Sequence, residues 1–315
     1  MNSPFKKCIT MVCAMLVLPA FGNTLSLNDA LRNTYTACIG IDDALMDLKK
    51  MAGINTAITG VGTAAGAGAT VVGIVKSAKD AKAEALEQIL KEIEEIQNTT
   101  QPLTDAEFAT FMSEFNTVYK SDISNKESVQ TELDKLNKQS KNLGNWRTGL
   151  MAGSAVTNVA GAVIANKNRV DEDLNTQIEM CKIAVKNLQN SILQAQINGE
   201  NVSEAVQIAN ACGQYEYADL SKIDTKAKGA MISSAIGATT GIAGTIFSAS
   251  ANTDKTRNDN SDAGKQKEKN LNLTSNILAG ATTAASATAT VFNATQISAI
   301  KKVAEIAANC TGVLQ

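Results

Sequence analysis

Four long stretches of this chain carry no charged residue, and they limit the fold more than any other feature of the sequence. They are residues 52–75, 148–166, 229–253 and 270–300, and each is rich in Gly, Ala, Ser and Thr. Helices can run unbroken through them, because the three prolines, Pro4, Pro19 and Pro102, all lie elsewhere. Only 4% of the residues are aromatic, while Ala, Leu, Lys, Glu and Gln are abundant, so a β-rich fold is disfavoured. The chain is predicted to be all-α.

The first 22 residues have the layout of a signal peptide. Lys6 and Lys7 precede an apolar run over residues 8–18, and a proline and a small-residue triplet ending at Gly22 follow it. This pattern predicts export, with cleavage after Gly22, to the bacterial periplasm, the cell surface or the medium. A retained membrane anchor is the other interpretation, but the apolar run is shorter than the ~20 residues that a spanning helix needs.

Export would also allow the cysteines to form disulfides. Removal of residues 1–22 leaves Cys38, Cys181, Cys212 and Cys310. An even number of cysteines in an exported chain predicts two disulfides. Their wide spacing argues against a metal site, which usually includes a close ligand pair such as C-x-x-C, and it excludes a redox motif of that type.

The charge-free stretches and the cysteines occur in matching order twice along the chain. Cys38 leads into AGINTAITGVGTAAGAG much as Cys212 leads into KGAMISSAIGATTGIAG, and the second and fourth stretches are each followed by a cysteine, Cys181 or Cys310. We therefore predict a two-fold internal duplication of long antiparallel helical hairpins forming an elongated bundle, with copies at residues 23–200 and 201–315. Chance similarity between Ala- and Gly-rich segments is the alternative.

The lengths of the predicted hairpin arms favour one disulfide pairing. In the second copy the polar cluster at residues 252–264 predicts a turn, and residue 261 lies midway between Cys212 and Cys310. Two helices that leave this turn bring both cysteines to the same level, which favours pairing Cys212 with Cys310 and Cys38 with Cys181. The other pairing, Cys181 with Cys212 and Cys38 with Cys310, stays open, because residues 182–211 can form a short hairpin of their own.

The first copy contains an insertion at residues 77–142, which we call the tip. Its segment KDAKAEALEQILKEIEEIQ has apolar residues at helical spacing among Lys and Glu, as in an amphipathic or coiled-coil helix. Thr104 and Glu107 have the spacing of a capping box. The tip is either a small helical cap with its own core or a surface for a protein partner. The candidate partner-binding residues are Phe108, Phe111, Phe115 and Tyr119.

Small residues recur at helical spacing within the charge-free stretches and predict close helix packing. The candidate packing residues are Gly62 and Gly66, Gly149 and Gly153, and Gly237 and Gly241. Such glycine-zipper patterns give tight hairpins in water and drive helix association in lipid. Trp146 lies beside Arg147 at the start of the second stretch, and we expect it to be a core residue at a helix end in preference to an interfacial membrane anchor.

Enzymatic function is not expected from this sequence. The chain has no histidine, so it contains no catalytic triad and no His-ligated metal, and it has no phosphate-binding loop motif. We predict no catalytic, cofactor-binding or metal-binding residue and no small-molecule substrate. Without Lys6 and Lys7, 27 basic and 31 acidic residues give a net charge of −4, which disfavours nucleic acid as a partner.

Two functional classes remain. The first is an exported structural or interaction protein that binds a protein partner or itself. The second is a membrane-inserting protein, similar in architecture to helical pore formers, that uses the Gly- and Ala-rich hairpins. The composition of residues 52–75 suits an element that is soluble when packed, because Asn55 and several Thr and Gly dilute the Ile and Val.

Overall fold

The computed structural model describes residues 25–99, 104–259 and 261–315. The protein is all-α, as predicted: 90% of the described residues are helical, and none of them lies in a strand. The predicted signal peptide, residues 1–22, lies outside the described residues.

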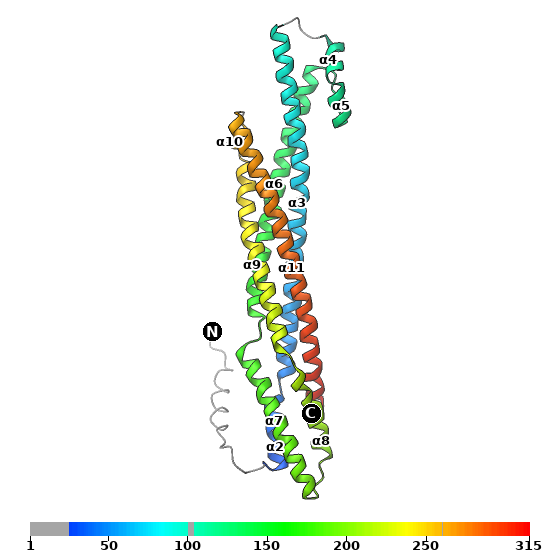
Figure 1. Cartoon of the computed structure of the whole chain (residues 1–315), viewed down its shortest axis with the longest axis vertical. Helices are drawn as coiled ribbons and strands as arrows, with labels where there is room; N and C mark the ends of the chain where they lie inside the picture. Colours follow the sequence, from blue (N-terminus) through cyan, green and yellow to red (C-terminus); the bar gives the residue numbers. More distant parts are fainter. Residues whose placement is uncertain (1–24, 100–103, 260) are drawn as a thin grey trace. The chain divides into compact units, whose positions relative to one another are not determined.

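Helices follow one another with short connections (Figure 1). In chain order they are α2 (Leu27–Cys38), α3 (Ile41–Thr99), α4 (Asp105–Phe111), α5 (Ser113–Tyr119), α6 (Lys126–Lys167), α7 (Glu172–Ile197), α8 (Ser203–Gly213), the 3-10 helix η2 (Gln214–Tyr217), α9 (Leu220–Ala251), α10 (Asp254–Arg257) and α11 (Asp262–Leu314).

Local sequence explains where the helices begin and end. Thr104 and Glu107 form the predicted capping box at the start of α4. Gly40 separates α2 from α3 with φ of +83°, a conformation that favours glycine, and Gly199 does the same after α7 with φ of +77°. The break at Gly40 divides the first arm of the predicted hairpin directly after Cys38.

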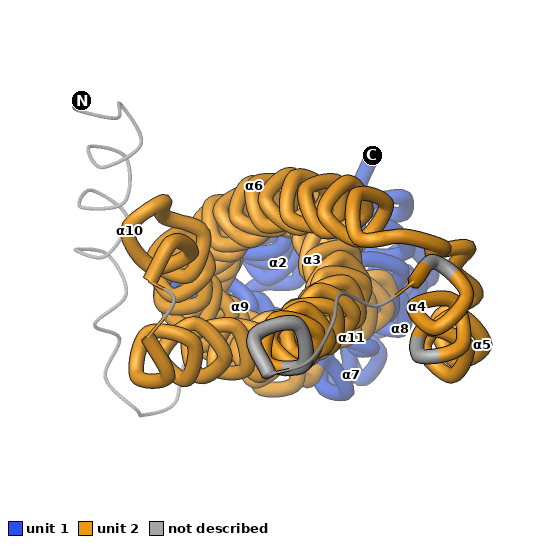
Figure 2. The backbone as a smooth tube through the Cα atoms, turned by 90° about the horizontal axis from the view of Figure 1, so that it is seen from above, with its two compact units in different colours: residues 1–45, 171–218, 302–315 blue, residues 46–170, 219–301 orange. Residues whose placement is uncertain are grey.

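The chain divides into two compact units that interleave in sequence (Figure 2). Unit 1 contains residues 1–45, 171–218 and 302–315, and unit 2 contains residues 46–170 and 219–301. The predicted boundary between the copies, at residues 200 and 201, falls inside unit 1 in the turn between α7 and α8. The division into copies concerns the repeat in the sequence, and it stays a prediction.

Unit 1 is held together by an apolar core and two disulfides. Ile41, Ile178, Leu188 and Tyr215 are fully buried. Helix α2 packs along α7, where the Thr34 hydroxyl donates to the Ala184 carbonyl (3.3 Å). Because large apolar side chains fill this interior, unit 1 follows the usual pattern of a water-soluble protein.

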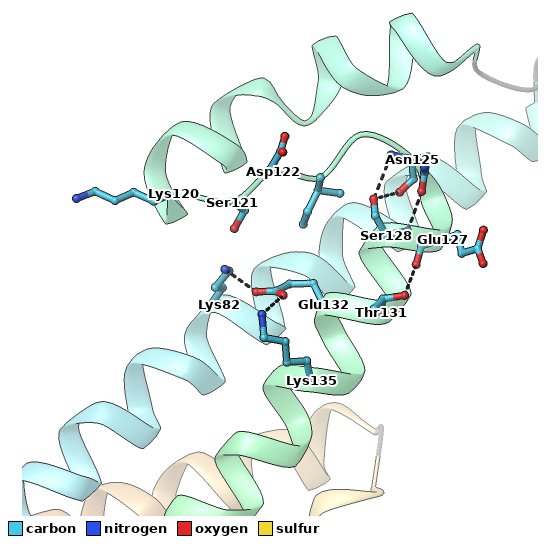
Figure 3. Close-up of a pocket in the computed structure, with 11 residues that line it drawn as sticks. Lys82, Lys120, Ser121, Asp122, Asn125, Glu127, Ser128, Thr131, Glu132 and Lys135 are labelled. Atoms are coloured by element: carbon cyan, nitrogen blue, oxygen red, sulfur yellow. Dashed lines mark hydrogen bonds and ion pairs between the residues drawn. The ribbon is translucent and has the colours of Figure 1, made fainter.

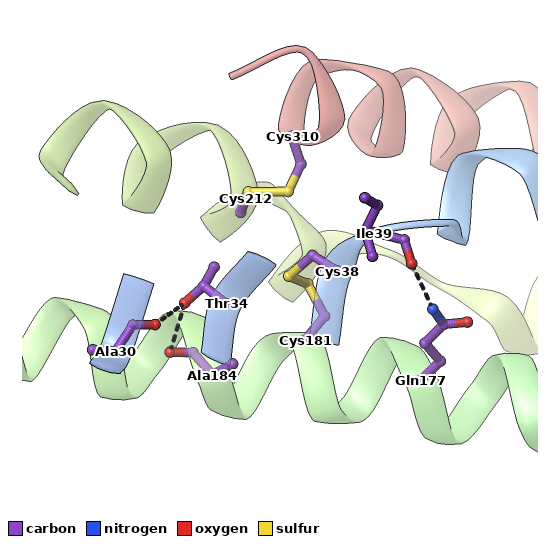
Figure 4. Close-up of a disulfide and its surroundings, with 9 residues drawn as sticks. All are labelled: Ala30, Thr34, Cys38, Ile39, Gln177, Cys181, Ala184, Cys212 and Cys310. Carbon is purple, nitrogen blue, oxygen red and sulfur yellow. Dashed lines mark hydrogen bonds between the residues drawn. A yellow bond between two sulfur atoms is a disulfide. The ribbon is translucent and has the colours of Figure 1, made fainter. Parts of the chain in front are cut away.

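The disulfides pair Cys38 with Cys181 and Cys212 with Cys310, which confirms the favoured pairing (Figure 4). The short hairpin that kept the other pairing open is present as α7 and α8, but its cysteines are not joined to each other.

The wide spacing of the cysteines proved a poor guide to their distance in space. The Sγ atoms of Cys38, Cys212 and Cys310 all lie within 4.8 Å of one another, because α2, α8 and α11 meet at this point. In the structure these sulfur atoms form disulfides, and a disulfide sulfur is not the thiolate that binds a metal.

Candidate functional site

The interior of unit 2 is made of small and polar residues. Helices α3, α6, α9 and α11 all contribute to it (Figure 1). On α3 the buried positions follow a spacing of three and four residues, so they share one face. These positions are Ala52, Asn55, Thr59, Gly62, Gly66, Ala69, Gly73 and Lys76. None of them carries a large apolar side chain.

The other three helices repeat this pattern. We call the whole set the small-residue interior. Beside the α3 positions it contains Gly144, Arg147, Met151, Ser154, Ala155, Asn158, Gly161 and Ala165 on α6, Ala230, Ser233, Ser234, Gly237, Ala238, Gly241, Gly244 and Ser248 on α9, and Ser275, Ala279, Thr282, Ala285, Ser286, Ala289, Asn293 and Gln296 on α11. Met151 is the one large apolar side chain among them; at the start of α9 and near residue 300 of α11, unit 2 also buries Leu220, Ile223 and Ile300.

Hydrogen bonds between helices fix the polar members of this interior. The Asn55 amide donates to the Asn293 side-chain oxygen (2.9 Å), and the Asn158 amide donates to the Ser286 hydroxyl (2.7 Å). The Ser154 hydroxyl reaches across to the backbone carbonyl of α3 at Gly62 (2.8 Å). Bonds to the backbone require close helix approach, and paired side chains set the register in which the helices pack.

Four of the six predicted packing glycines lie at such close approaches. A Cβ at Gly62 would lie 2.6 Å from the Thr157 hydroxyl oxygen, and one at Gly237 would lie 2.8 Å from Asn158. Gly66 faces Thr283, and Gly241 faces the backbone of Ala155. The other two glycines are arranged differently.

Gly149 and Gly153 face open space. Among the described residues, no atom of another helix lies within 4 Å of the place that a Cβ would take at either glycine, so the prediction that they pack against another helix is wrong. Both glycines lie on the outer face of α6. Their spacing matches that of the packing pairs, but the interior of α6 uses Gly144 and Gly161 instead.

The outside of the same helices carries the large apolar side chains that the interior lacks. We call them the apolar belt. The belt consists of Ile54, Val61, Val71, Ile74 and Val75 on α3, Val156, Val159 and Val163 on α6, Ile232, Ile236, Ile242 and Ile246 on α9, and Leu273, Ile277 and Val291 on α11, all of them exposed. Four neighbouring helices thus turn β-branched and leucine side chains outward and small polar ones inward.

The length and composition of these helices agree with an apolar outer surface. Among the described residues three helical stretches, Leu27–Glu95, Lys126–Ile197 and Leu220–Ala251, are long and apolar enough to cross a membrane. Their most apolar windows are only 28%, 33% and 39% buried. Most residues of these windows are therefore not buried by the protein's own packing.

Exposed threonines on these helices satisfy their hydroxyl groups within their own helix. Thr239 donates to the Ala235 carbonyl (3.2 Å), and Thr288 donates to the Ala284 carbonyl (2.8 Å). Thr295 makes the same bond to Val291 (3.0 Å). A hydroxyl that bonds back to its helix does not require water as an acceptor.

A buried ion network ends the small-residue interior on the side of the tip. Lys76 is 1% exposed, and its ammonium lies 2.6 Å from the Asp80 carboxylate and 3.6 Å from that of Glu268. Arg257 reaches Glu268 at 3.8 Å. Burial raises the pKa of Glu268 above its usual range, and nearby Asp80 acts in the same direction, while Lys76 and Arg257 oppose them.

Arg147 lies next to this network and is fully buried. Its guanidinium donates to the Asn272 backbone carbonyl (3.1 Å), but its Nε has no hydrogen-bond partner among the described residues. Its neighbour Trp146 is 70% exposed, so the expectation that Trp146 is a core residue is wrong. Consecutive helix positions point about 100° apart, and here Arg147 takes the inward one.

The tip buries large apolar side chains, unlike the rest of unit 2, where most of the buried residues are small or polar. Its core is apolar, and it contains Ala83, Leu86, Ile93, Phe108, Met112, Phe115, Ile123, Val129, Leu133 and Leu136. Phe108 and Phe115 are therefore part of the core and are not free to bind a partner, and Tyr119 packs against it. The side chain of Phe111 lies outside the described residues. The tip thus has a core of its own, as in the first of its two interpretations, and binding of a partner to its surface stays a prediction.

A polar groove of about 570 Å³ opens beside this core (Figure 3). Glu132 lies in it between two lysines, at 2.9 Å from Lys82 and 3.1 Å from Lys135. The three side chains neutralise one another in part, so the groove offers no concentrated charge to a ligand.

The inverted polarity of unit 2 was not recognised from the sequence, although a signal for it exists. Read at the spacing of Asn55, Thr59, Gly62 and Gly66, the α3 stretch separates into a small polar face and an Ile/Val face. The composition alone predicts only that Gly and Thr lower the overall hydrophobicity of this stretch. In the structure the exposed Ile and Val residues lie on one face of α3 and the small polar residues on the other. Burial of Lys76 and Arg147 has no comparable signal, since both residues stand at the edge of a charged segment.

The arrangement contains packing, hydrogen-bonding and ion-pair groups, and the acidic side chains at its edge are engaged with lysine or arginine. No family model, no curated protein and no solved structure matches the chain.

Proposed function

We propose that this protein is a membrane-inserting helical protein whose unit 2 places its apolar belt in a lipid bilayer. The observation that carries the proposal is the reversed polarity of α3, α6, α9 and α11, with small polar residues inside and Ile, Val and Leu outside. In water, exposed apolar side chains on four neighbouring helices are costly, and surfaces of this kind commonly mark a site of interaction. In lipid it is the expected surface, and polar side chains then face the interior.

The dimensions of the belt support a bilayer as its environment. From Ile54 to Val75, α3 rises roughly 32 Å at about 1.5 Å per residue, close to the ~30 Å of a hydrocarbon core. The first charged residues beyond the α3 stretch are Lys50 and Lys76. The exposed threonine hydroxyls, bonded to their own helix, also suit an environment without water.

We further propose that the protein acts outside the cytoplasm and without enzymatic chemistry. The signal-peptide pattern and the disulfides support the location. The twofold repeat of hairpins, α3 with α6 and α9 with α11, remains part of this proposal. It is supported by opposite helix directions within each pair. Thr59 on α3 lies against Gly161 and Gly73 against Arg147, while on α9 Thr240 bonds Thr282 and the Gly244 carbonyl accepts from Ser275 (3.0 Å).

A structural or interaction protein is the second candidate. The observation that favours it is the tip, which has an apolar core, a charged surface and an open groove, as in a water-soluble module. In this case a protein partner or a second copy of the chain would cover the belt.

Vesicle binding tests the proposal and separates the two candidates. The oxidised protein is mixed with phospholipid vesicles, and partition and dye leakage are measured. Val61→Lys, Val156→Lys and Ile236→Lys each place a charge on the belt, where it costs about 2.5 to 3.5 kcal/mol at a bilayer centre. We expect each variant to lose about 100-fold in partition, because these side chains contact lipid.

Val118→Lys on the tip and Ile183→Lys in unit 1 are matched controls, since both residues are exposed apolar side chains outside the belt. These controls should partition like the unmodified protein. Absence of both partition and leakage, for the oxidised and the reduced protein alike, would refute the membrane proposal and leave the second candidate.

A further inference from the structure

Trp146 is the only tryptophan of the chain, and it stands outward on α6 with most of its surface exposed. An indole ring has a large apolar body and one N–H donor. Side chains of this kind gather where lipid meets water, because one part of the ring avoids water and the other requires it. In a water-soluble protein, an exposed Trp146 would have no apolar surroundings for the body of its ring.

The helices around Trp146 fix the level at which it stands in unit 2. Its neighbour Asn145 accepts from the Asn252 amide (2.6 Å), at the end of α9. On the other side, Arg147 donates to the backbone of α11 at Asn272 (3.1 Å). Trp146 therefore lies level with the buried ion network, where the small-residue interior ends.

The surface of unit 2 changes its chemistry at this same level. On one side lie belt residues, among them Val71 and Ile277, which are exposed. On the other side lie the exposed charges of Lys141, Lys269 and Asp254. Trp146 stands at the border between the two surfaces.

The far edge of the belt lies one bilayer thickness away. Lys167 is the first charged residue of α6 after Arg147. The 21 residues from Trp146 to Lys167 rise roughly 32 Å along the helix, against ~30 Å for a hydrocarbon core. A bilayer whose one edge is at Trp146 would thus have its other edge where the lysines resume.

We propose that Trp146 anchors unit 2 at the lipid–water interface of one leaflet, with its indole ring among the phospholipid headgroups. This inference rests on the proposed function and deepens it, since it names the lipid region that one residue contacts and the depth at which the bundle sits. It also places the buried ion network at the headgroup level, outside the hydrocarbon.

The single tryptophan makes the test direct. The full chain is bound to phosphatidylcholine vesicles that contain phosphatidylglycerol and lipids brominated at a series of depths, and tryptophan emission is recorded. Two comparison probes are made in the Trp146→Phe background: Val61→Trp reports from the belt and Val118→Trp from the tip. Both replaced residues are exposed, so neither substitution fills a packed interior.

We expect the emission of Trp146 to shift to the blue on binding, to lose accessibility to acrylamide, and to be quenched most by bromines near the headgroup. The belt probe should be quenched by the deepest bromines, and the tip probe should respond to acrylamide as it does in buffer. The three depths would then follow the order of the residues along the helices.

The outcomes separate this inference from the function on which it rests. If the belt probe responds to deep bromines while Trp146 stays as accessible to acrylamide as in buffer, the anchor is wrong and the membrane function stands. If no probe responds to vesicles, both are wrong. A blue shift that depends on protein concentration and not on vesicles would place Trp146 at a contact between copies, which also overturns the anchor.

Discussion

Individual carboxyl groups make the stability of unit 2 depend on pH. Glu268 is largely buried between Lys76 and Arg257, and its pKa is raised chiefly by burial. Asp219, at the start of α9, is exposed and has its pKa lowered to about 2 by hydrogen bonds from Ser221 and Lys222. The two carboxyl groups therefore have opposite effects on stability. A raised pKa favours the folded state at low pH, and a lowered one favours it at higher pH.

The stability of Glu268→Gln relative to the unmodified protein should increase as the pH rises. Below the unfolded pKa of a glutamate both proteins carry a neutral side chain at this position. As the pH rises through the raised folded pKa, the unmodified protein loses stability and the variant does not. Melting temperatures of both proteins, measured by circular dichroism from about pH 4 to pH 8, give the difference.

Asp219→Asn is the opposite case and serves as the control. Its relative stability should fall as the pH rises towards the unfolded pKa of an aspartate, because the unmodified protein gains stability that the amide cannot gain. Parallel curves for the two variants would contradict the assignment of Glu268 to a buried network.

At the scale of the helices, spacing alone could not tell inward glycines from outward ones. The pairs Gly237 with Gly241 and Gly149 with Gly153 have the same separation in sequence. The first pair lies against α6, and the second faces away from the other helices. The difference depends on which face of each helix turns inward, and that is decided by residues such as Asn158 and Ser154 that bond to other helices.

The two glycine pairs should respond to alanine with opposite signs. Gly241→Ala places a methyl group 3.1 Å from the Ala155 Cα, and backbone cannot move aside cheaply, so we expect a loss of about 1 to 3 kcal/mol. Gly153→Ala meets open space and removes a helix-weakening glycine, so we expect a gain of about 0.5 to 1 kcal/mol. Denaturant unfolding in one common detergent or buffer measures both, and equal effects would contradict the placement of the helices.

The helical class and the cysteine pairing could be predicted from the sequence, because both depend on features that extend over long segments of the chain. Unbroken helices follow from the absence of proline, and the pairing follows from arm lengths that tolerate an error of a few residues. The inverted polarity of unit 2 depends on one-residue differences in helix face. The breaks at Gly40 and between Lys167 and Asp171 depend on local backbone conformation. Neither is visible in composition.

The whole molecule combines interiors of two kinds. Unit 1 and the tip bury large apolar residues such as Ile178 and Leu133, as a protein in water does. The small-residue interior of unit 2 buries Asn, Ser and Thr instead. Both disulfides lie in unit 1, where they close loops of 143 and 98 residues. Covalent links therefore supplement an apolar core that is built from three separate segments of the chain.

Each disulfide should contribute up to about 5 kcal/mol in the chain-entropy model, less where the unfolded chain is compact. We expect Cys38→Ser with Cys181→Ser to lower the stability of unit 1 by an amount of this order. Hydrogen exchange should increase in α2 and α7 and change little in the tip. Peptide mapping without reductant should recover Cys38 with Cys181 and Cys212 with Cys310, and a peptide linking Cys181 to Cys212 would contradict the pairing.

Because trypsin cuts after Lys and Arg, the four charge-free stretches contain no cleavage site for it. No lysine or arginine occurs between Lys50 and Lys76, Arg147 and Lys167, Lys228 and Lys255, or Lys269 and Lys301. A tryptic digest therefore releases the belt as four long, poorly soluble peptides, whereas the long peptides at residues 187–222 and 92–120, outside the belt, carry several acidic residues. The part of the protein that we place in the membrane becomes visible only to a protease that cuts after apolar residues.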